Sequence, residues 1–300
     1  MLPRVAGEHP FGNPLTPPRS GSLIIDNNDM GGDAMAAEGR KSIFITGAAS
    51  GIGLACAKRF ASAGWFVGLS DIDKAGLKAA HEAIGIANGS VHGLDVRDRE
   101  AWANALGDFG KETGGKADVL LNNAGVARFG VLEDLSDADC DIQIDINIKG
   151  VINGARAGLP LLKSAGGRLI NVASCAGLYG SPKLAVYSAT KFAVRGLSEA
   201  LDVEYAQHGV SVACVMPWFV ETPILHAGAS GTNENMADAL RAGGLEVYPV
   251  EDAAQVVWDA VHGKSLHYFV GKRAKQMRFA TSHMPNVVRK QLRSRPLLSS

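Results

Sequence analysis

The chain has 300 residues, of which 46% are hydrophobic, which is enough for the core of one large α/β domain. Thirty basic side chains balance thirty acidic ones, so the net charge does not indicate a nucleic-acid partner. No apolar run in the sequence approaches the length of a membrane span, and the four cysteines have no metal-like spacing. We therefore expect a cytoplasmic protein with reduced thiols and no bound metal.

Residues 1–40 differ in composition from the rest of the chain. They hold five prolines and six glycines, with little periodicity of hydrophobic residues. Their acidic side chains argue against a transit peptide. We expect a disordered N-terminal extension here, and Met30 and Met35 leave open a later natural start.

From Lys41 onward, short apolar runs alternate with longer helical patterns. Continuous apolar strands indicate a sheet that is covered on both faces. The alternation predicts a single Rossmann-type, doubly wound parallel sheet of about seven strands, with helices on both faces. The strands are expected at Ser42–Thr46, Phe66–Leu69, Val91–Leu94, Val119–Asn122, Arg168–Ala173, Val210–Met216 and Tyr268–Val270. The helices are expected near Ile52–Ala63, Lys74–Ile84, Arg99–Glu112, Asp137–Ser164, Val186–His208 and Asp252–Val261.

A glycine-rich turn, "TGAASGIG", follows the first expected strand and opens the first helix. Its glycines are Gly47, Gly51 and Gly53, with the spacing G-x-x-x-G-x-G. A turn without Cβ atoms lets backbone N–H groups approach a pyrophosphate, and the helix N-terminus adds a partial positive charge. The turn therefore predicts a dinucleotide at the carboxyl ends of the strands, where ligands of such sheets bind.

The second expected strand leads to Asp71, 18 residues after Gly53, where a ribose-binding acid is expected. A carboxylate there accepts hydrogen bonds from the ribose hydroxyls and repels a 2′-phosphate of about −2 charge. No Arg or Lys occupies Ala48–Ser50 or Ile72 to neutralise such a phosphate, so we expect NAD rather than NADP. Asp95, after the third strand, is expected to meet the adenine amino group.

Three more motifs follow the later strands. "NNAG" ends at Gly125, Ser174 follows the fifth strand, and "YSATK" runs from Tyr187 to Lys191 in an expected helix. Positions four apart face the same way on a helix, so the tyrosine and lysine can share one site. Taken alone, the pair is a weak signal, because a core tyrosine beside a solvated lysine gives the same spacing.

Together with Asn147 in "DINIKG", these motifs resemble the short-chain dehydrogenase/reductase family over about residues 41–271. The resemblance implies an oligomeric, usually tetrameric Rossmann enzyme that moves hydride between a nicotinamide and a small-molecule alcohol or ketone. Tyr187 is similar to the family's general acid/base and Lys191 to its partner, which also grips the nicotinamide ribose. Ser174 is similar to the donor to the substrate oxygen, and Asn147 to the residue that holds a proton-relay water. The implied cofactor contacts are Gly47, Ser50, Ile52, Gly53, Asp71, Asp95, Val96, Asn123, Gly125, Tyr187, Lys191, Pro217, Val220 and Thr222.

The tyrosine must be made more acidic to act as a base, because its free pKa is near 10. An ammonium about 5 Å away, at an effective dielectric constant near 20, offers roughly 3 kcal/mol, equivalent to about two pKa units. We therefore expect Lys191 to lower the pKa of Tyr187.

The segment after the sixth strand departs from the family pattern. Many members have Pro-Gly there, whereas this chain has Pro217 followed by Trp218. We expect Trp218 to wall the substrate pocket. The long segment from Phe219 to Val250, rich in Gly, Ala and Asn, is expected to be an irregular lid over the substrate. Its apolar side chains suit a bulky apolar alcohol better than a sugar.

Three functions compete. The first is an NAD-dependent dehydrogenase of apolar secondary alcohols. The second is a reductase of carrier-bound 3-oxoacyl groups, which usually uses NADPH and so conflicts with Asp71. The third is a non-catalytic nucleotide sensor. The sequence argues against it, because it keeps all four of the family's catalytic residues, Asn147, Ser174, Tyr187 and Lys191. A sugar-nucleotide epimerase would carry a different glycine spacing.

The C-terminal tail, residues 272–300, is basic. From Ala260 to Ser300 there are nine Lys or Arg residues and no Asp or Glu. Apolar residues are interleaved with the basic ones, and Pro285 should break any single long helix. We expect a solvated tail that is partly packed on the neighbouring subunit, and the alternative is contact with an anionic membrane surface.

Overall fold

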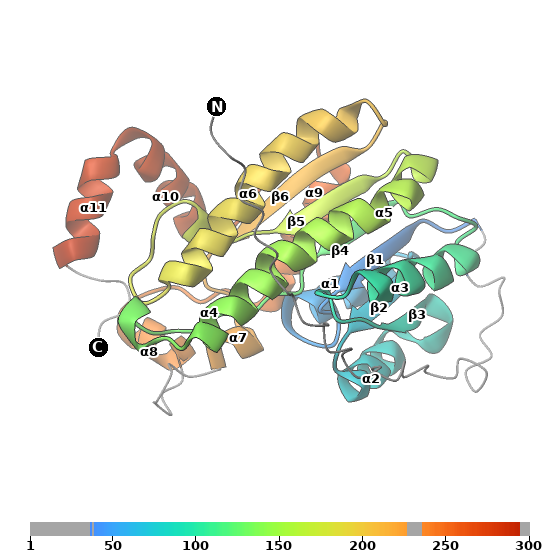
Figure 1. Ribbon diagram of the computed structural model, residues 1–300, viewed down its shortest axis with the longest axis horizontal. Coiled ribbons are helices and arrows are strands. Elements are labelled where there is room, and N and C mark those ends of the chain that lie inside the picture. The colour runs from blue at the N-terminus through green and yellow to red at the C-terminus, as the bar shows by residue number, and fades with distance from the viewer. Residues whose placement is uncertain (1–36, 38, 227–235, 295–300) are drawn as a thin grey trace, which may run out of the picture. The chain divides into compact units, whose positions relative to one another are not determined.

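Seven parallel strands form one sheet in the computed structural model, which describes Ala37, residues 39–226 and residues 236–294 (Figure 1). The strand order is β3-β2-β1-β4-β5-β6-β7, which confirms the doubly wound sheet expected from the sequence. The strands are β1 (Ser42–Thr46), β2 (Phe66–Asp71), β3 (Gly89–Gly93), β4 (Val119–Asn122), β5 (Arg168–Val172), β6 (Ser211–Pro217) and β7 (His267–Val270). The expected disordered extension, residues 1–40, lies outside the described residues apart from Ala37, Gly39 and Arg40.

Helices cover both faces of this sheet (Figure 1). They are α1 (Gly51–Ser62), α2 (Lys74–Ile84), α3 (Arg99–Glu112), α4 (Asp137–Ile144), α5 (Val151–Ala165), α6 (Ala185–Ala206), α7 (Pro223–His226), α8 (Met236–Ala242), α9 (Val250–His262), α10 (Lys272–His283) and α11 (Pro285–Ser294). One face of the sheet packs on α1, α2 and α9, and the other packs on α3, α5 and α6.

Alternate side chains of each strand enter different layers of the core. In β1, Ile43 and Ile45 pack with α1 and α9, whereas Phe44 points to the other face and meets Phe109 of α3 edge to face. All of these side chains are fully buried. This two-sided burial explains why the strands are continuously apolar rather than alternating.

The expected helix Asp137–Ser164 is wrong in one respect, because a π-helical segment over Asp145–Gly150 separates α4 from α5. The closing residue of that segment packs directly on the loop after β3, since a Cβ atom on Gly150 would lie 2.7 Å from Val96 Cγ2. A π segment accommodates one extra residue without breaking the helix, so hydrophobic periodicity does not reveal it.

The segment Phe219–Val250 was expected to be irregular, but its described parts contain α7 and α8. Its two ends are tied together, because Val220 and Tyr248 form a parallel bridge. Glu221 N donates to Tyr248 O over 2.9 Å, and Tyr248 N donates to Phe219 O over 2.9 Å. The segment therefore leaves the sheet and returns at one point.

The basic tail forms two helices, α10 and α11, and α11 begins at Pro285, where a break was expected. Ala274 and Val288 are buried, while Met277 and Leu292 pack against an apolar cluster of the main body. In the part of the chain that the structure describes, no helix combines the length and apolarity needed to cross a membrane.

Candidate active site

A cavity of about 530 Å³ lies at the carboxyl edge of the sheet, where loops from β1, β2, β3, β4, β5 and β6 meet the start of α6. Its lining brings together most of the residues that the sequence singles out: Gly47, Ser50, Ile52, Asp71, Asp95, Val96, Asn123, Gly125, Ser174, Tyr187, Lys191, Pro217, Trp218, Val220 and Thr222. Gly53 and Asn147 do not line it but contact residues that do. Parallel strands thus carry distant segments of the sequence to one site.

The glycine-rich turn requires its glycines. Gly47 and Gly51 have φ values of 68° and 53°, in the left-handed region that favours glycine. A Cβ atom on Gly53 would lie 2.0 Å from the Gly47 carbonyl oxygen. The side chain of Ser50, the N-cap of α1, makes no capping hydrogen bond, so first-turn N–H groups are available to an anion. This cradle fits the pyrophosphate of a dinucleotide.

Thr46, at the end of β1, joins that turn to the loop after β4. Its Oγ1 accepts hydrogen bonds of 3.0 Å from the backbone N of Asn123 and of Ala124. The Asn123 side chain returns a bond of 2.9 Å to the Thr46 carbonyl oxygen. The sequence interpretation gave Thr46 no role, although a hydroxyl residue immediately before the first glycine was a visible signal.

Asn147, in the π segment, is fully buried and its side chain is fully engaged. Its Oδ1 accepts from Val126 N over 2.9 Å, and its Nδ2 donates to Val126 O and Thr190 Oγ1 over 2.8 and 3.1 Å. These bonds fix the loop after β4 to α6.

Gly125 lies where a larger residue would obstruct the site. A Cβ atom there would be 3.1 Å from Asn147 Oδ1 and 3.5 Å from Lys191 Nζ. The glycine therefore lets the chain pass beside the lysine ammonium.

Tyr187 and Lys191 lie one turn apart at the start of α6, as the i, i+4 spacing predicts. Lys191 is buried, its Nζ donates to the Val172 carbonyl oxygen over 3.0 Å, and the same atom lies 5.5 Å from the centre of the Tyr187 ring. Ser174 follows β5 and lines the same cavity, and its Oγ accepts from Ala176 N over 3.1 Å. A phenol, a hydroxyl and an ammonium thus meet at one cavity wall.

The protonation properties of this group differ from the expectation. Burial raises the pKa of Tyr187 to about 12, and a side-chain hydrogen bond with Ser174 acts in the opposite direction. Burial also lowers the pKa of Lys191 to about 8. The expected lowering of the Tyr187 pKa is therefore wrong for the protein alone, because burial removes solvation from the phenolate and is the largest influence on this group.

Asp71 belongs to the cavity and not to the following helix. Its Oδ2 accepts from Ala49 N over 3.1 Å, and its Oδ1 accepts from Asp73 N over 3.1 Å. The cap of α2 is instead Asp73, whose Oδ1 accepts from Gly76 N over 3.0 Å. The carboxylate of Asp71 is thereby held beside the glycine-rich turn.

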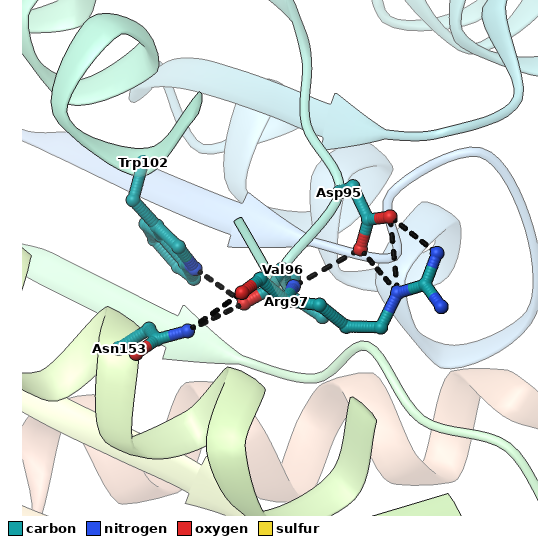
Figure 2. A network of polar contacts seen from close by, with 5 residues as sticks. All are labelled: Asp95, Val96, Arg97, Trp102 and Asn153. Carbon is teal, nitrogen blue, oxygen red and sulfur yellow. Dashed lines mark hydrogen bonds and ion pairs between the residues drawn. The ribbon is translucent and has the colours of Figure 1, made fainter. Parts of the chain in front are cut away.

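Arg97 is a residue at this end of the cavity that the sequence interpretation missed. It lines the cavity with Asp71 and Ile72, and its guanidinium pairs with Asp95 (Figure 2). Asp95 therefore does not present a solitary carboxylate. The sequence signal for this ion pair was a basic residue, Arg97, two positions after the acid Asp95.

The opposite end of the cavity is largely apolar. Trp218 is 7% exposed and packs edge to face on Phe219, with the ring centres 5.2 Å apart. Further apolar side chains line this end: Phe129, Ile142, Leu184, Ile224 and Leu225. Trp218, where many family members have glycine, does not have a positive φ, so the tryptophan causes no backbone strain there. Among the described residues, the non-glycine residue with positive φ is Lys183. This wall suits a bulky apolar substrate.

Comparison with known proteins agrees with this arrangement. The family model described as short chain dehydrogenase matches residues 41–233. Oxidoreductase UcpA of Escherichia coli (strain K12) is 40% identical over 196 residues, which cover 64% of this chain and 74% of that protein. The 3-oxoacyl-[acyl-carrier-protein] reductase FabG of Thermotoga maritima is 35% identical over 227 residues, covering 72% and 88%. A solved short chain dehydrogenase/reductase from Burkholderia phymatum, in complex with NAD, superposes with a TM-score of 0.72 at 27% identity and covers 84% of this chain and 95% of that one.

Proposed function

The chain belongs to the short-chain dehydrogenase family, and from this premise we propose that it is an NAD-dependent dehydrogenase of bulky apolar secondary alcohols, or a reductase of the corresponding ketones. Oxidoreduction with a nicotinamide cofactor follows from the family. The observation that carries the proposal is the meeting of Tyr187, Lys191 and Ser174 at one wall of a cavity whose other end is a glycine cradle.

Each of the three residues has one task. The nicotinamide, when bound, exchanges hydride with the substrate carbon. The Tyr187 hydroxyl gives the accompanying proton to the substrate oxygen, or takes it from that oxygen. Ser174 Oγ donates to the same oxygen as negative charge develops on it. Lys191, whose pKa of about 8 keeps it charged at neutral pH, stabilises the phenolate form of the tyrosine.

The resting protonation state of Tyr187 follows from its pKa, which is about 12. At neutral pH the phenol is protonated and is ready to donate to a carbonyl oxygen. Oxidation of an alcohol requires the deprotonated form, so additional positive charge must enter the site first. A bound oxidised nicotinamide would add its positive charge to that of Lys191, and both would favour the phenolate of Tyr187.

The choice of NAD rests on Asp71. Its carboxylate is held beside the glycine-rich turn by the backbone of Ala49 and Asp73, where it accepts ribose hydroxyls and repels a 2′-phosphate. Ile72 is 69% exposed and adds no charge. The NAD complex of the Burkholderia phymatum protein supports the same choice.

The segment Phe219–Val250 is proposed to be the substrate lid. Leu225, Ala237 and Leu240 are buried in an apolar cluster with Phe129 and Leu184, next to Tyr187. The lid helices α7 and α8 therefore pack on the N-terminal end of α6 and on the apolar end of the cavity. A bulky apolar substrate would replace part of this packing, which supports the proposed substrate class.

The enzyme is also proposed to be a cytoplasmic homo-oligomer. The outer faces of α4 and α6 leave large apolar side chains exposed, namely Ile144, Phe192 and Val203, with exposures of 38%, 42% and 76%. Helix faces of this kind suit burial against a second copy.

A second candidate is reduction of carrier-bound 3-oxoacyl groups. The similarity to the Thermotoga maritima reductase favours it, as does the basic surface of α10 and α11, which could meet an acidic carrier. Asp71 opposes it if the reductant is NADPH.

The deciding experiment is an absorbance assay of NADH formation against matched panels of sterols, other alcohols and hydroxyacyl thioesters, each with NAD and with NADP. We expect turnover with NAD and bulky apolar alcohols. Turnover confined to hydroxyacyl thioesters would select the second candidate. Absence of turnover with every panel, despite NAD binding, would favour a nucleotide sensor.

A further inference from the structure

Asp95, Val96 and Arg97 form a short reversal between β3 and α3, closed by a bond of 2.9 Å from Asp98 N to Asp95 O. Asp95 and Arg97 are joined side-on (Figure 2). Arg97 Nε lies 2.9 and 3.0 Å from the two carboxylate oxygens, and Nη2 lies 2.6 Å from Oδ2. The backbone N of Arg97 adds a bond of 3.0 Å to Oδ1. Such a fork fixes orientation as well as charge.

The backbone beneath this fork is held from inside the protein. Trp102 Nε1 donates to the Val96 carbonyl oxygen over 3.0 Å, and Asn153 Nδ2 reaches the same oxygen over 3.1 Å from α5 (Figure 2). Asn153 Nδ2 also donates to the Arg97 carbonyl oxygen over 3.3 Å. Trp102 and Asn153 are both buried. Two core side chains thus anchor a loop whose outer side lines the cavity.

This bracing has a chemical consequence. Hydrogen bonding to Arg97 holds the pKa of the Asp95 carboxyl below its usual range, so the group stays an acceptor at neutral pH. A carboxylate has about four acceptor positions, and the planar guanidinium approaches along one edge of it. Without the Arg97 guanidinium, the backbone N of residue 97 would hold this partly exposed side chain at Oδ1 alone and leave the orientation of Oδ2 less restricted. Both residues line the same end of the cavity as Asp71.

We propose that Arg97 is a positioning residue that holds the Asp95 carboxylate in the one orientation that accepts the 6-amino group of adenine, so that the pair selects adenine over a 6-oxo purine. The inference rests on the proposed function, because it assumes a dinucleotide in this cavity. A 6-oxo group would present an acceptor to an acceptor. One charge-assisted hydrogen bond would then be lost, which corresponds to about tenfold to a hundredfold in affinity.

Calorimetric titration of the full-length protein with NAD and with nicotinamide hypoxanthine dinucleotide tests this. The unmodified protein should bind NAD at least tenfold more tightly. Arg97→Met should bring the ratio of the two affinities close to one, and Arg97→Lys should do nearly the same, because it keeps the charge and loses the fork. Asp95→Asn keeps one acceptor oxygen and adds an NH2 donor, so it can pair with either purine and should lower the preference for NAD over the hypoxanthine compound.

Lys111→Met is the matched control, since Lys111 pairs with Asp108 on α3 and does not line the cavity. It should leave the ratio unchanged. An unaltered ratio in Arg97→Met, with thermal unfolding equal to that of the unmodified protein, would overturn the inference. Equal binding of the two dinucleotides by the unmodified protein would refute the inference alone, whereas binding of neither would refute the proposed function.

Discussion

Lys191 Nζ donates a hydrogen bond of 3.0 Å to the carbonyl oxygen of Val172, and so the ammonium is held by the main chain of β5. The phenol of Tyr187 is a more distant neighbour, with its ring centre 5.5 Å away. The lysine position is therefore set by the sheet, independently of the protonation state of the tyrosine. This relationship allows the contributions of the two residues to be separated by mutation.

Replacing Tyr187 with Phe should lower kcat by a factor of about 10² to 10⁴, the usual contribution of a general acid or base. The affinity for NAD should stay within about threefold, because the change removes only the hydroxyl and keeps the ring. Steady-state kinetics and calorimetric titration measure the two quantities. A kcat close to that of the unmodified enzyme would remove Tyr187 from the mechanism.

Replacing Lys191 with Met should abolish most activity and at the same time stabilise the fold near pH 7. The pKa of Lys191 is lowered from 10.5 to about 8, so the folded protein holds the charged form at a cost. A tenfold change in a protonation constant corresponds to about 1.4 kcal/mol, and the lost bond to Val172 offsets about 1 kcal/mol. The shift from 10.5 to about 8 corresponds to about 3 kcal/mol, so a net gain of about 2 kcal/mol in the free energy of unfolding is expected.

The sign of this effect can be followed with pH. Because the folded-state pKa is depressed, the cost is complete below about pH 8 and disappears as the pH rises toward 10.5, where the unfolded chain also loses its proton. The advantage of Lys191→Met in chemical denaturation should shrink over that interval. An advantage that grew with pH would contradict the assignment of a buried ammonium.

Converting the ribose end with Asp71→Ser and Ile72→Arg should raise the ratio of kcat/KM for NADP to that for NAD by about a hundredfold, or about 3 kcal/mol. The double change removes a repelling carboxylate and adds a guanidinium at a position that is 69% exposed. Asp73→Ser is the control, because it removes a nearby acid that caps α2 and does not line the cavity. An unmodified enzyme that already prefers NADP would show the interpretation of Asp71 to be wrong.

The lid should depend on Arg241, which joins α8 to Glu221 at the base of the lid by an ion pair. Arg241→Gln should raise KM for the alcohol several-fold and change kcat by less than about twofold, since the chemistry lies elsewhere. Arg241→Lys should recover most of the loss. Proteolysis within Phe219–Val250 should slow when NAD and substrate are present. Equal rates of cleavage with and without these ligands would count against a lid.

The C-terminal tail should contribute stability. Ending the chain at His283 removes Val288 and Leu292, which are buried and half-buried, and should cost about 1–3 kcal/mol of the free energy of unfolding. Denaturant titration measures this. Pelleting of the full-length protein with anionic vesicles at physiological salt, reduced in the shortened chain, would instead favour membrane contact.

The sequence predicted the central strands well because they are largely apolar, whereas the edge strand β3 (Gly89–Gly93), in which Val91 is the one large apolar residue, was expected two residues too late. Val119–Asn122 and Ser42–Thr46 were expected with their correct bounds. The π segment around Asn147 could not be foreseen, since one extra residue in a turn barely alters the spacing of apolar positions. The helix α8 was missed although its own residues, MADALRA, favour a helix, because the Gly and Asn residues elsewhere in the segment suggested irregular structure, and α7 is only four residues long.

The site residues were foreseen where a short motif carries them. Residues that work through contacts distant in sequence were not. Asn171 and Ser198 are both fully buried and hydrogen-bonded to each other over 3.0 Å beneath the site, and neither has a local signal. The pKa of Tyr187 was expected with the wrong sign, because a sequence gives the neighbouring charge and not the solvent that burial removes.

The parallel bridge between Val220 and Tyr248 pairs the two ends of the lid, so the chain leaves β6 and returns beside it at one point. The segment between these two residues can be lengthened, shortened or exchanged with little effect on the sheet, because the entropic cost of closing a loop grows only slowly with its length. The substrate range can thereby change by exchange of the lid segment, while the catalytic residues keep their geometry. Chimeras that take residues 224–247 from a relative, and so keep the proposed cofactor contact Thr222, should retain the cofactor preference of this chain and take on the donor's substrate range.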